Sequence, residues 1–250
     1  MSDKKIASKI AENLLEIQAV KLSPNEPFTW ASGWKSPIYC DNRVTLSHSG
    51  LRKYIKKKLA EAIKNNFKGV EAIVGVATAG IPQGALVADK LDLPFAYIRP
   101  EPKDHGRKNQ MEGDLKKGSK VVVIEDLIST GGSSLKAIKA LRDEGFEVLG
   151  LCAIFTYGFD IAAENFMLEN CKMITLSNYD TLIQKALESK YIKENDVANL
   201  EQWRKDPANW KGETPKIVAK KPIAKKAVAK KIVAKKAVAK KVVSKKTTKK

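Results

Sequence analysis

The segment VVVIEDLISTGGSS (residues 121–134) decides how the rest of the sequence is interpreted. Four apolar residues run directly into two carboxylates, Glu125 and Asp126, and a loop of Ser, Thr and Gly follows. Glycine permits close backbone approach, and the first turn of a helix presents unpaired N–H groups with a partial positive charge. We therefore interpret residues 129–133 as a phosphate-binding loop between a buried strand and a helix. The adjacent acids suit ribose hydroxyls or a metal ion carried by a substrate, so the segment fits a phosphorylated sugar.

A purely structural role is the alternative interpretation of this segment. Gly-rich turns between strands and helices occur throughout α/β proteins, and paired acids there can simply cap the helix. The segment is not a Walker loop, since no Gly-Lys-Ser/Thr ends it, and it lacks the G-x-G-x-x-G dinucleotide fingerprint. The complete string, with its apolar run, Glu-Asp pair and Ser-Thr-Gly-Gly-Ser loop, is far more specific than the Gly-Gly turn alone.

Runs rich in β-branched residues alternate with helical patterns from residue 70 onward. Near-continuous apolar strands that alternate with helices are typical of parallel sheets covered on both faces, so we predict an α/β fold with a doubly wound, mostly parallel sheet flanked by helices. A hairpin-like or irregular segment is predicted for residues 28–43. The predicted strands are residues 70–76, 94–98, 120–126, 147–155 and 172–176, and the predicted helices are 3–20, 47–66 with Ser47 as N-cap, 81–91, 133–144, 181–189 and 194–205.

The net charge of +18 on 250 residues is concentrated at the C-terminus. Residues 216–250 hold 15 of the 46 basic side chains and none of the 28 acidic ones, which leaves the rest of the chain nearly neutral. Their five-residue repeat forms no core-facing stripe in a helix or a strand, so we predict that this segment is disordered. Its lysines suit nonspecific contact with polyanions such as nucleic acid, and a purely solubilising extension is the alternative.

Several classes of protein are excluded by composition. The uncharged stretches are too short for a membrane span, and charges near the N-terminus occupy the place where a signal peptide needs an apolar core. Three cysteines without metal-ligand spacing indicate free thiols in a reducing cytoplasm. We therefore expect a cytoplasmic protein that makes no membrane contact.

Four segments together resemble one enzyme family. Residues 121–134 look like the phosphoribosyl-pyrophosphate (PRPP) motif of the type I phosphoribosyltransferases. FTWASGWKSPIYCDNR (residues 28–43) is similar to the N-terminal signature of the orotate phosphoribosyltransferases. RPEPKDHG (residues 99–106) resembles their flexible catalytic loop, and GVATAGIPQGA (residues 75–85) resembles their pyrophosphate-side loop.

The resemblance implies the type I phosphoribosyltransferase fold over residues 1–210, with an N-terminal hood at about residues 1–45 and the disordered lysine-rich tail at residues 211–250. It implies transfer of the 5-phosphoribosyl group from PRPP to orotate, with release of pyrophosphate, in pyrimidine biosynthesis. Magnesium would arrive mainly on PRPP rather than in a protein metal site. In the family the flexible loop reaches the neighbouring active site, so a homodimer is implied.

The resemblance also assigns roles to residues. Lys103 and Asp126 are the candidates for catalysis, and Ser129 and Tyr39 are the candidates for orotate binding. The implied PRPP-binding residues are Arg99, Lys103, His105, Glu125, Asp126, Leu127, Ile128, Ser129, Thr130, Gly131, Gly132 and Ser133.

This sequence departs from the family pattern at several positions, and these departures affect mainly the assignment of the residues that bind orotate. Many bacterial members carry lysines where this chain has Ala31, Ala79 and Pro100, and residues 153–160 lack an arginine that pairs with orotate in the family. Two other functions therefore remain as alternatives. A type I phosphoribosyltransferase for a purine base is disfavoured by the signature of residues 28–43, and a PRPP-sensing regulator that binds nucleic acid is disfavoured by the intact Lys-Asp-His-Gly loop.

Overall fold

The computed structural model describes residues 3–30, 32–99 and 110–212. These residues belong to one structural unit, Met1–Thr214. The predictions for Lys103, His105 and the tail from residue 213 onward lie outside the described residues.

A six-stranded sheet lies at the centre of the described part of the chain, in the order β10-β9-β8-β5-β6-β7. Neighbouring strands are parallel except for β6 and β7. From β5 the chain adds β6 on one side and later β8 on the other, so the strand order reverses between β5 and β8. Open α/β sheets bind ligands outside the carboxyl ends of their strands at such a reversal. The strands are β5 (Ala72–Val76), β6 (Phe95–Ile98), β7 (Met111–Glu112), β8 (Lys120–Ile128), β9 (Glu147–Thr156) and β10 (Met173–Asn178).

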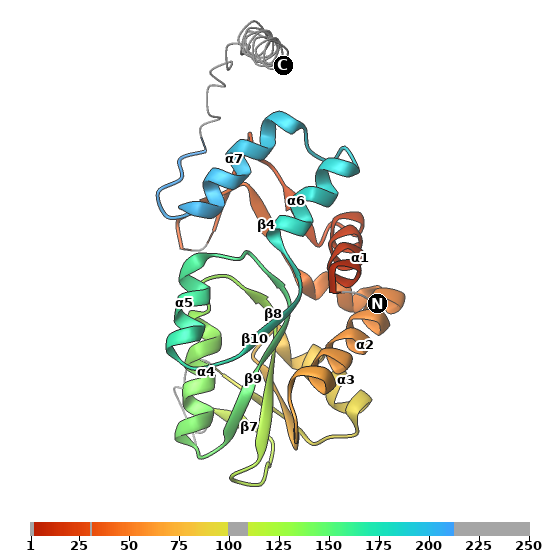
Figure 1. Cartoon of the computed structure of the whole chain (residues 1–250), viewed down its shortest axis with the longest axis vertical. Helices are drawn as coiled ribbons and strands as arrows, with labels where there is room; N and C mark the ends of the chain where they lie inside the picture. The colour runs from red at the N-terminus through yellow and green to blue at the C-terminus, as the bar shows by residue number, and fades with distance from the viewer. Residues whose placement is uncertain (1–2, 31, 100–109, 213–250) are drawn as a thin grey trace, which may run out of the picture. The chain divides into compact units, whose positions relative to one another are not determined.

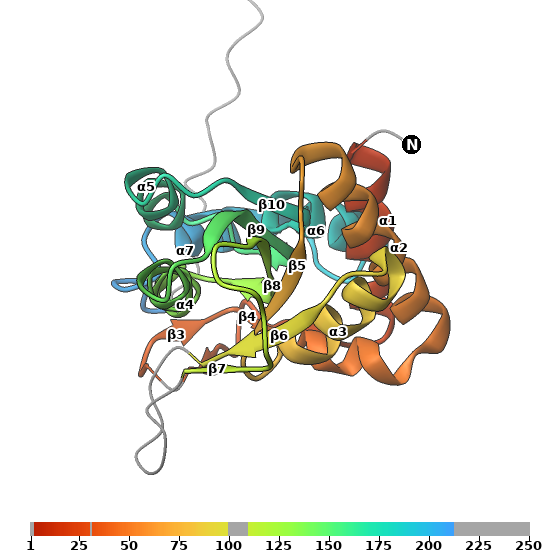
Figure 2. The ribbon, with the colours of Figure 1, turned by 90° about the horizontal axis from the view of Figure 1, so that it is seen from below.

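Both faces of the sheet are buried by helices. In β8, Val122 and Ile124 join one apolar cluster while Val121 and Val123 join another, because successive side chains point to opposite faces. Figures 1 and 2 show α2 and α3 on one side of the sheet and α4 and α5 on the other. The predicted doubly wound α/β fold is confirmed. The α-helices are α1 (Asp3–Glu16), α2 (Ser49–Asn66), α3 (Gly80–Leu91), α4 (Gly132–Asp143), α5 (Asp160–Leu168), α6 (Tyr179–Glu188) and α7 (Glu194–Lys205).

The N-terminal segment adds two small antiparallel ribbons and a 3-10 helix. β1 (Val20–Leu22) pairs with β4 (Ile38–Cys40), and β2 (Phe28–Thr29) pairs with β3 (Lys35–Ser36), as expected for a hairpin-like segment. The 3-10 helix η1 (Asn42–Ser47) follows, because the side chain of Asp41 accepts a hydrogen bond from the Arg43 N–H group at 3.1 Å and starts a tight turn. The prediction that Ser47 caps the following helix was therefore wrong: Ser47 ends η1, and His48 is the N-cap of α2.

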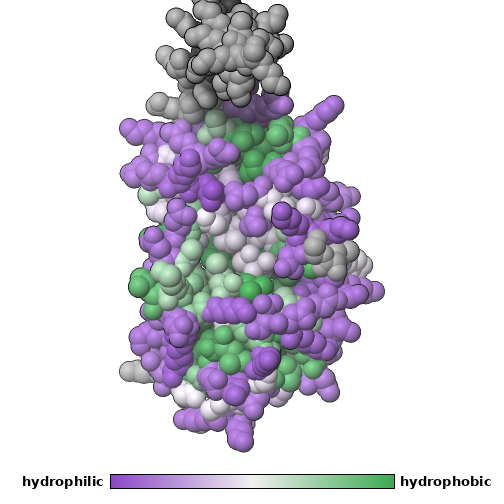
Figure 3. Space-filling model, in the orientation of Figure 1, coloured by the Kyte–Doolittle hydropathy of each residue, from purple (hydrophilic) through white to green (hydrophobic). Residues whose placement is uncertain are grey.

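Helix α5 is the one large element that the sequence analysis missed. Its inward side chains Ala162 and Phe166 are buried, whereas Ile161, Met167 and Leu168 are more than half exposed. This pattern gives only a narrow apolar stripe, which does not stand out by periodicity. Figure 3 shows hydrophobic patches between hydrophilic side chains on the face that includes α5. No helix among the described residues is long and apolar enough to cross a membrane.

Candidate active site

The acidic pair lies at the carboxyl end of β8, beside the reversal of strand order. Glu125 is buried with 6% of its surface exposed, and Asp126 is half-buried. The Asp126 backbone N–H and the Ser134 hydroxyl each donate a hydrogen bond to the Glu125 carboxyl, both at 3.1 Å. Glu125 is therefore fixed by its own loop and helix, and Asp126 is the more accessible acid of the pair.

Burial dominates the electrostatics of these two acids. Loss of solvent, followed by the charge of Asp126, raises the pKa of Glu125 to about 8. Burial also raises the pKa of Asp126 above its ordinary value. Carboxyl groups whose pKa values are shifted by burial and by a neighbouring charge are concentrated at functional sites.

The loop after the acidic pair has the geometry that a phosphate cradle requires. Gly131, the N-cap of α4, adopts a φ of +81°, and a Cβ at this position would lie 2.7 Å from the Phe166 ring. Only glycine fits both restrictions without strain. Because Gly131 has no side chain to cap the helix, the first N–H groups of the 12-residue helix α4 are free for an anion. Ser129 and Thr130 are half-buried beside them, and Gly132 and Ser133 are exposed.

Residues from β9 and α5 support this loop, and the sequence analysis did not select them. The Thr156 hydroxyl donates to the Ile128 carbonyl at 3.1 Å, and the Asn165 side chain donates to the Thr130 carbonyl at 3.4 Å. Phe166 packs against Gly131. Their signal in the sequence was weak, because these residues lie 22 to 32 positions beyond the end of the motif at Ser134 and have ordinary side chains.

The start of α3 lies directly against the same end of β8. A Cβ on Gly80 would collide with the Ile124 carbonyl oxygen and would lie 3.4 Å from the Glu125 Cα atom. Glycine at this position lets the loop between β5 and α3 approach the acidic pair. The structure thus brings the segment resembling a pyrophosphate-side loop next to the segment resembling a PRPP motif.

The N-terminal segment also reaches the carboxyl end of β8. The Asn42 side chain donates to the Asp126 carbonyl at 2.8 Å. Burial, and then the charges of Asp126 and Asp41, raise the pKa of the Cys40 thiol. Tyr39, on the same strand as Cys40, is 44% exposed, and its ring centroid lies 5.8 Å from that of Phe28. Tyr39 is therefore accessible at the edge of the site, while Asn42 is an additional residue that the sequence analysis missed.

Arg99 is the described member of the predicted flexible loop. It follows β6, and its backbone N–H donates to the Gln110 carbonyl at 3.0 Å, across the base of residues 100–109. The Gln110 side chain donates back to the Arg99 carbonyl at 3.2 Å. The structure therefore places the base of this loop at the carboxyl end of β6, at the same edge of the sheet as Asp126.

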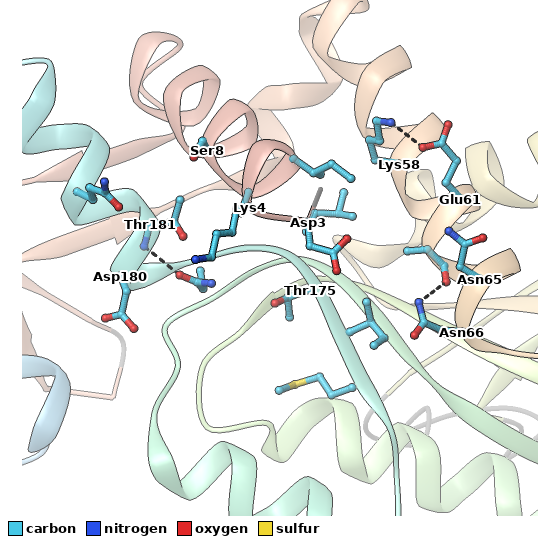
Figure 4. A pocket seen from close by; sticks show the side chains of 18 residues that line it. Asp3, Lys4, Ser8, Lys58, Glu61, Asn65, Asn66, Thr175, Asp180 and Thr181 are labelled. Atoms are coloured by element: carbon cyan, nitrogen blue, oxygen red, sulfur yellow. Dashed lines mark hydrogen bonds and ion pairs between the residues drawn. The ribbon is translucent and has the colours of Figure 1, made fainter. Parts of the chain in front are cut away.

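A hollow of about 920 Å³ elsewhere in the protein contains none of the predicted site residues. It lies between the start of α1, the end of α2, β10 and α6 (Figure 4). Two polar pairs lie around it: the Lys58 ammonium lies 2.6 Å from the Glu61 carboxylate, and the Asn178 side chain accepts from the Thr181 N–H group at 2.9 Å. The acidic pair and the glycine-led helix start that suit a sugar phosphate lie instead at the end of β8.

Glu125→Gln is expected to raise stability at alkaline pH. The free carboxyl titrates near 4.5 and the folded one near 8, so between these values the folded state holds a proton that the unfolded state has lost. The free energy of unfolding of the wild type should therefore fall by about 1.4 kcal/mol per pH unit through this window, and glutamine removes that loss. Urea unfolding at pH 6 and pH 8 measures the difference, with exposed Glu164→Gln as the control. Equal pH dependence in wild type and Glu125→Gln would show that Glu125 is ionised in the folded state.

Comparison with known proteins identifies the family of the fold. Residues 46–184 match the model of the phosphoribosyl transferase domain family. This range includes the acidic pair of β8 and the glycine-led start of α4. The fold and the site thus define a phosphoribosyltransferase.

Close relatives narrow the class. The chain is 56% identical over 207 residues to the orotate phosphoribosyltransferase of Phocaeicola vulgatus, an alignment that covers 83% of this chain and 98% of the relative. It is 58% identical over 205 residues to that of Listeria innocua, covering 82% and 98%. The crystal structure of the Aeropyrum pernix orotate phosphoribosyltransferase matches with a TM-score of 0.65 at 30% identity, covering 74% of this chain and 99% of that one. The chain belongs to the orotate phosphoribosyltransferase family.

Proposed function

We propose that this protein transfers the 5-phosphoribosyl group of PRPP to N1 of orotate, forming orotidine 5'-monophosphate and pyrophosphate in de novo pyrimidine biosynthesis. The observation that carries the proposal is the uncapped start of α4 beside the acidic pair of β8, in a chain more than half identical to orotate phosphoribosyltransferases.

The reaction breaks the bond between the ribose C1 atom and the pyrophosphate oxygen, and it leaves cationic character on the sugar. In our proposal the N–H groups of residues 129–133 bind the 5-phosphate and fix the ribose. The Asp126 carboxylate faces the ribose hydroxyls, where its charge also stabilises the developing cation. Binding at several points holds C1 in line with the base, which lowers the entropic barrier of the transfer.

Magnesium fits this site only as a partner of the substrate. The described residues contain no group of three or more His, Cys, Asp or Glu side chains that could hold a metal ion. Glu125 and Asp126 supply two carboxylates at most, and Mg²⁺ commonly combines one or two carboxylates with substrate phosphate oxygens and water. When bound, the ion would neutralise charge on the departing pyrophosphate.

The segment of residues 99–106 supplies cations for the pyrophosphate in our proposal. Arg99, Lys103 and His105 bind PRPP, and Lys103 is the catalytic member, because a positive charge next to the leaving group favours bond breaking. We further propose a homodimer in which this loop serves the neighbouring active site. A cytoplasmic location is supported by three free cysteines, Cys40, Cys152 and Cys171.

Lys103→Ala is expected to lower kcat by about tenfold to a hundredfold, because one charge that stabilises the departing pyrophosphate is lost. PRPP should still bind through the α4 turn and the acidic pair. Steady-state kinetics and a separate PRPP titration distinguish the two effects. Unchanged kcat would remove the catalytic role from Lys103.

Orotate contacts are proposed for Ser129 and Tyr39. A serine hydroxyl donates or accepts a hydrogen bond to a planar, carboxylate-bearing ring, and the accessible Tyr39 ring offers a stacking surface. A direct test of the function is an absorbance assay for orotate consumption with PRPP and magnesium, run in parallel with adenine and hypoxanthine. Turnover with a purine alone would favour a purine enzyme. No turnover, together with RNA binding at physiological salt, would favour a PRPP-sensing regulator.

The tail of residues 216–250 is proposed to contact polyanions nonspecifically. Deleting it is expected to leave orotate turnover unchanged and to abolish retention on a polyanion column at low salt, because its 15 lysines carry most of the net charge. Elution of both forms over a salt gradient is the measurement. Equal retention without the tail would place the cationic surface elsewhere and leave the tail as a solubilising extension.

A further inference from the structure

Three buried polar side chains form a connected group behind the acidic pair. Asn42 and Thr45 come from η1 and Gln83 comes from α3, and each is at most 1% exposed. The Gln83 amide donates to the Thr45 hydroxyl at 3.2 Å, and the Thr45 hydroxyl donates to the main-chain carbonyl of Asn42 at 2.6 Å. The Asn42 side chain in turn donates to the main-chain carbonyl of Asp126 at 2.8 Å. The group therefore joins three elements that are distant in sequence and ends on the main chain of Asp126.

This group is costly as a means of stabilising the fold. The Asn42 Oδ1 and Gln83 Oε1 atoms are buried without a hydrogen-bond partner among the described residues. A buried polar atom without a partner lowers the stability of the fold, and apolar side chains of similar size would avoid that loss. In both Asn42 and Gln83 the amide N–H group forms a hydrogen bond, whereas the amide oxygen has no partner among the described residues.

The Asn42 amide N–H group donates to the main chain of Asp126, where a small shift would change the position of the proposed ribose-facing carboxylate. The bond to the Asp126 carbonyl fixes the backbone that carries the proposed ribose-facing carboxylate, and it spans 84 residues of sequence. At the other end of the group, Gln83 lies one turn into α3, whose first residue Gly80 packs on the β8 main chain next to Glu125. A displacement of about 1 Å in a reacting geometry costs on the order of 10²-fold in rate.

We propose that Asn42 is a positioning residue for phosphoribosyl transfer: from the N-terminal segment it holds the Asp126 main chain so that the Asp126 carboxylate meets the ribose hydroxyls, with Thr45 and Gln83 as its support. This inference rests on the proposed function, because it requires Asp126 to contact PRPP.

The test compares Asn42→Ala with Asn199→Ala. Asn199 is an equally buried asparagine, whose side chain donates to the Pro24 carbonyl at 3.1 Å and accepts from the Trp210 indole N–H at 2.9 Å. Neither Pro24 nor Trp210 belongs to β8 or α4. We expect Asn42→Ala to lower kcat/KM for PRPP by about tenfold to a hundredfold. The KM for orotate should change less, and Asn199→Ala should lower the melting temperature while leaving both kinetic parameters close to wild type.

Thr45→Val provides a second variant if Asn42→Ala does not fold, because it removes only the hydroxyl between Gln83 and Asn42. It should lower kcat/KM for PRPP in the same direction by a smaller factor. If the wild type is active and a folded Asn42→Ala or Thr45→Val variant keeps the wild-type kcat/KM, the inference is wrong. It is also wrong if the loss of activity simply follows the loss of melting temperature in all variants, Asn199→Ala included. A wild type that does not consume orotate would instead remove the proposed function, and this inference with it.

Discussion

Replacing Asp126 by asparagine is expected to lower kcat/KM for PRPP by about 10²- to 10³-fold, the loss typical of removing one preorganised electrostatic contact from a transition state. Asparagine preserves the size of the side chain and removes its charge. Hydrogen bonds from the ribose hydroxyls to a carboxylate are stronger than those to an amide, and the difference grows as positive charge develops on the sugar. Steady-state kinetics with orotate and magnesium PRPP measure the effect.

The matched control for this variant is Asp143→Asn at the far end of α4. The Asp143 carboxylate is exposed and lies 2.6 Å from the Lys139 ammonium, and a solvent-exposed ion pair of this kind contributes little to stability. Its loss should leave the kinetics unchanged. If Asp126→Asn retained wild-type kcat/KM, the carboxylate would have no role in the transfer.

Gly131→Ala is expected to raise the KM for PRPP by about 10²-fold or more, because the N–H groups of the cradle lose their alignment. The φ of +81° is strained for alanine, and its Cβ would lie 2.7 Å from the Phe166 ring. Together the strain and the overpacking should destabilise the fold by about 2–4 kcal/mol. Kinetics combined with urea unfolding separate the two consequences.

Gly145, just beyond the other end of α4, offers a control with the same backbone problem. Its φ is +91°, but a Cβ there meets no atom within 4 Å. Gly145→Ala should therefore cost about 1 kcal/mol of stability through strain alone and leave the KM for PRPP unchanged. Equal KM values for Gly131→Ala and wild type would show that the start of α4 does not bind the phosphate.

The sequence predicted the structure correctly where one local pattern determines it. The apolar run of β8, the acids after it and the glycine-led start of α4 are contiguous, so their geometry follows from strand, turn and helix rules. The same holds for the alternation of β-branched runs and helical patterns, which predicted the sheet. Hydrophobic periodicity did not detect α5, which has only a narrow buried stripe.

The supporting residues could not be predicted, because their role depends on tertiary contacts. Asn42 precedes Asp126 by 84 residues, and Asn165 follows Thr130 by 35. Asn42 lies within the signature of residues 28–43, but that segment does not reveal which group its side chain contacts, and nothing in the local sequence distinguishes Asn165 from a surface asparagine. Ser47 illustrates the opposite error: it is a good helix N-cap in isolation, but the capping of η1 by Asp41 shifts the start of α2 past it.

Calorimetric titration of PRPP into the wild-type protein, with and without magnesium, tests most directly whether PRPP binds at the carboxyl end of β8. We predict saturable, magnesium-dependent binding of PRPP that Gly131→Ala severely weakens and Gly145→Ala leaves intact. The absence of magnesium-dependent heat from the folded wild-type protein, or undiminished binding by folded Gly131→Ala, would contradict it.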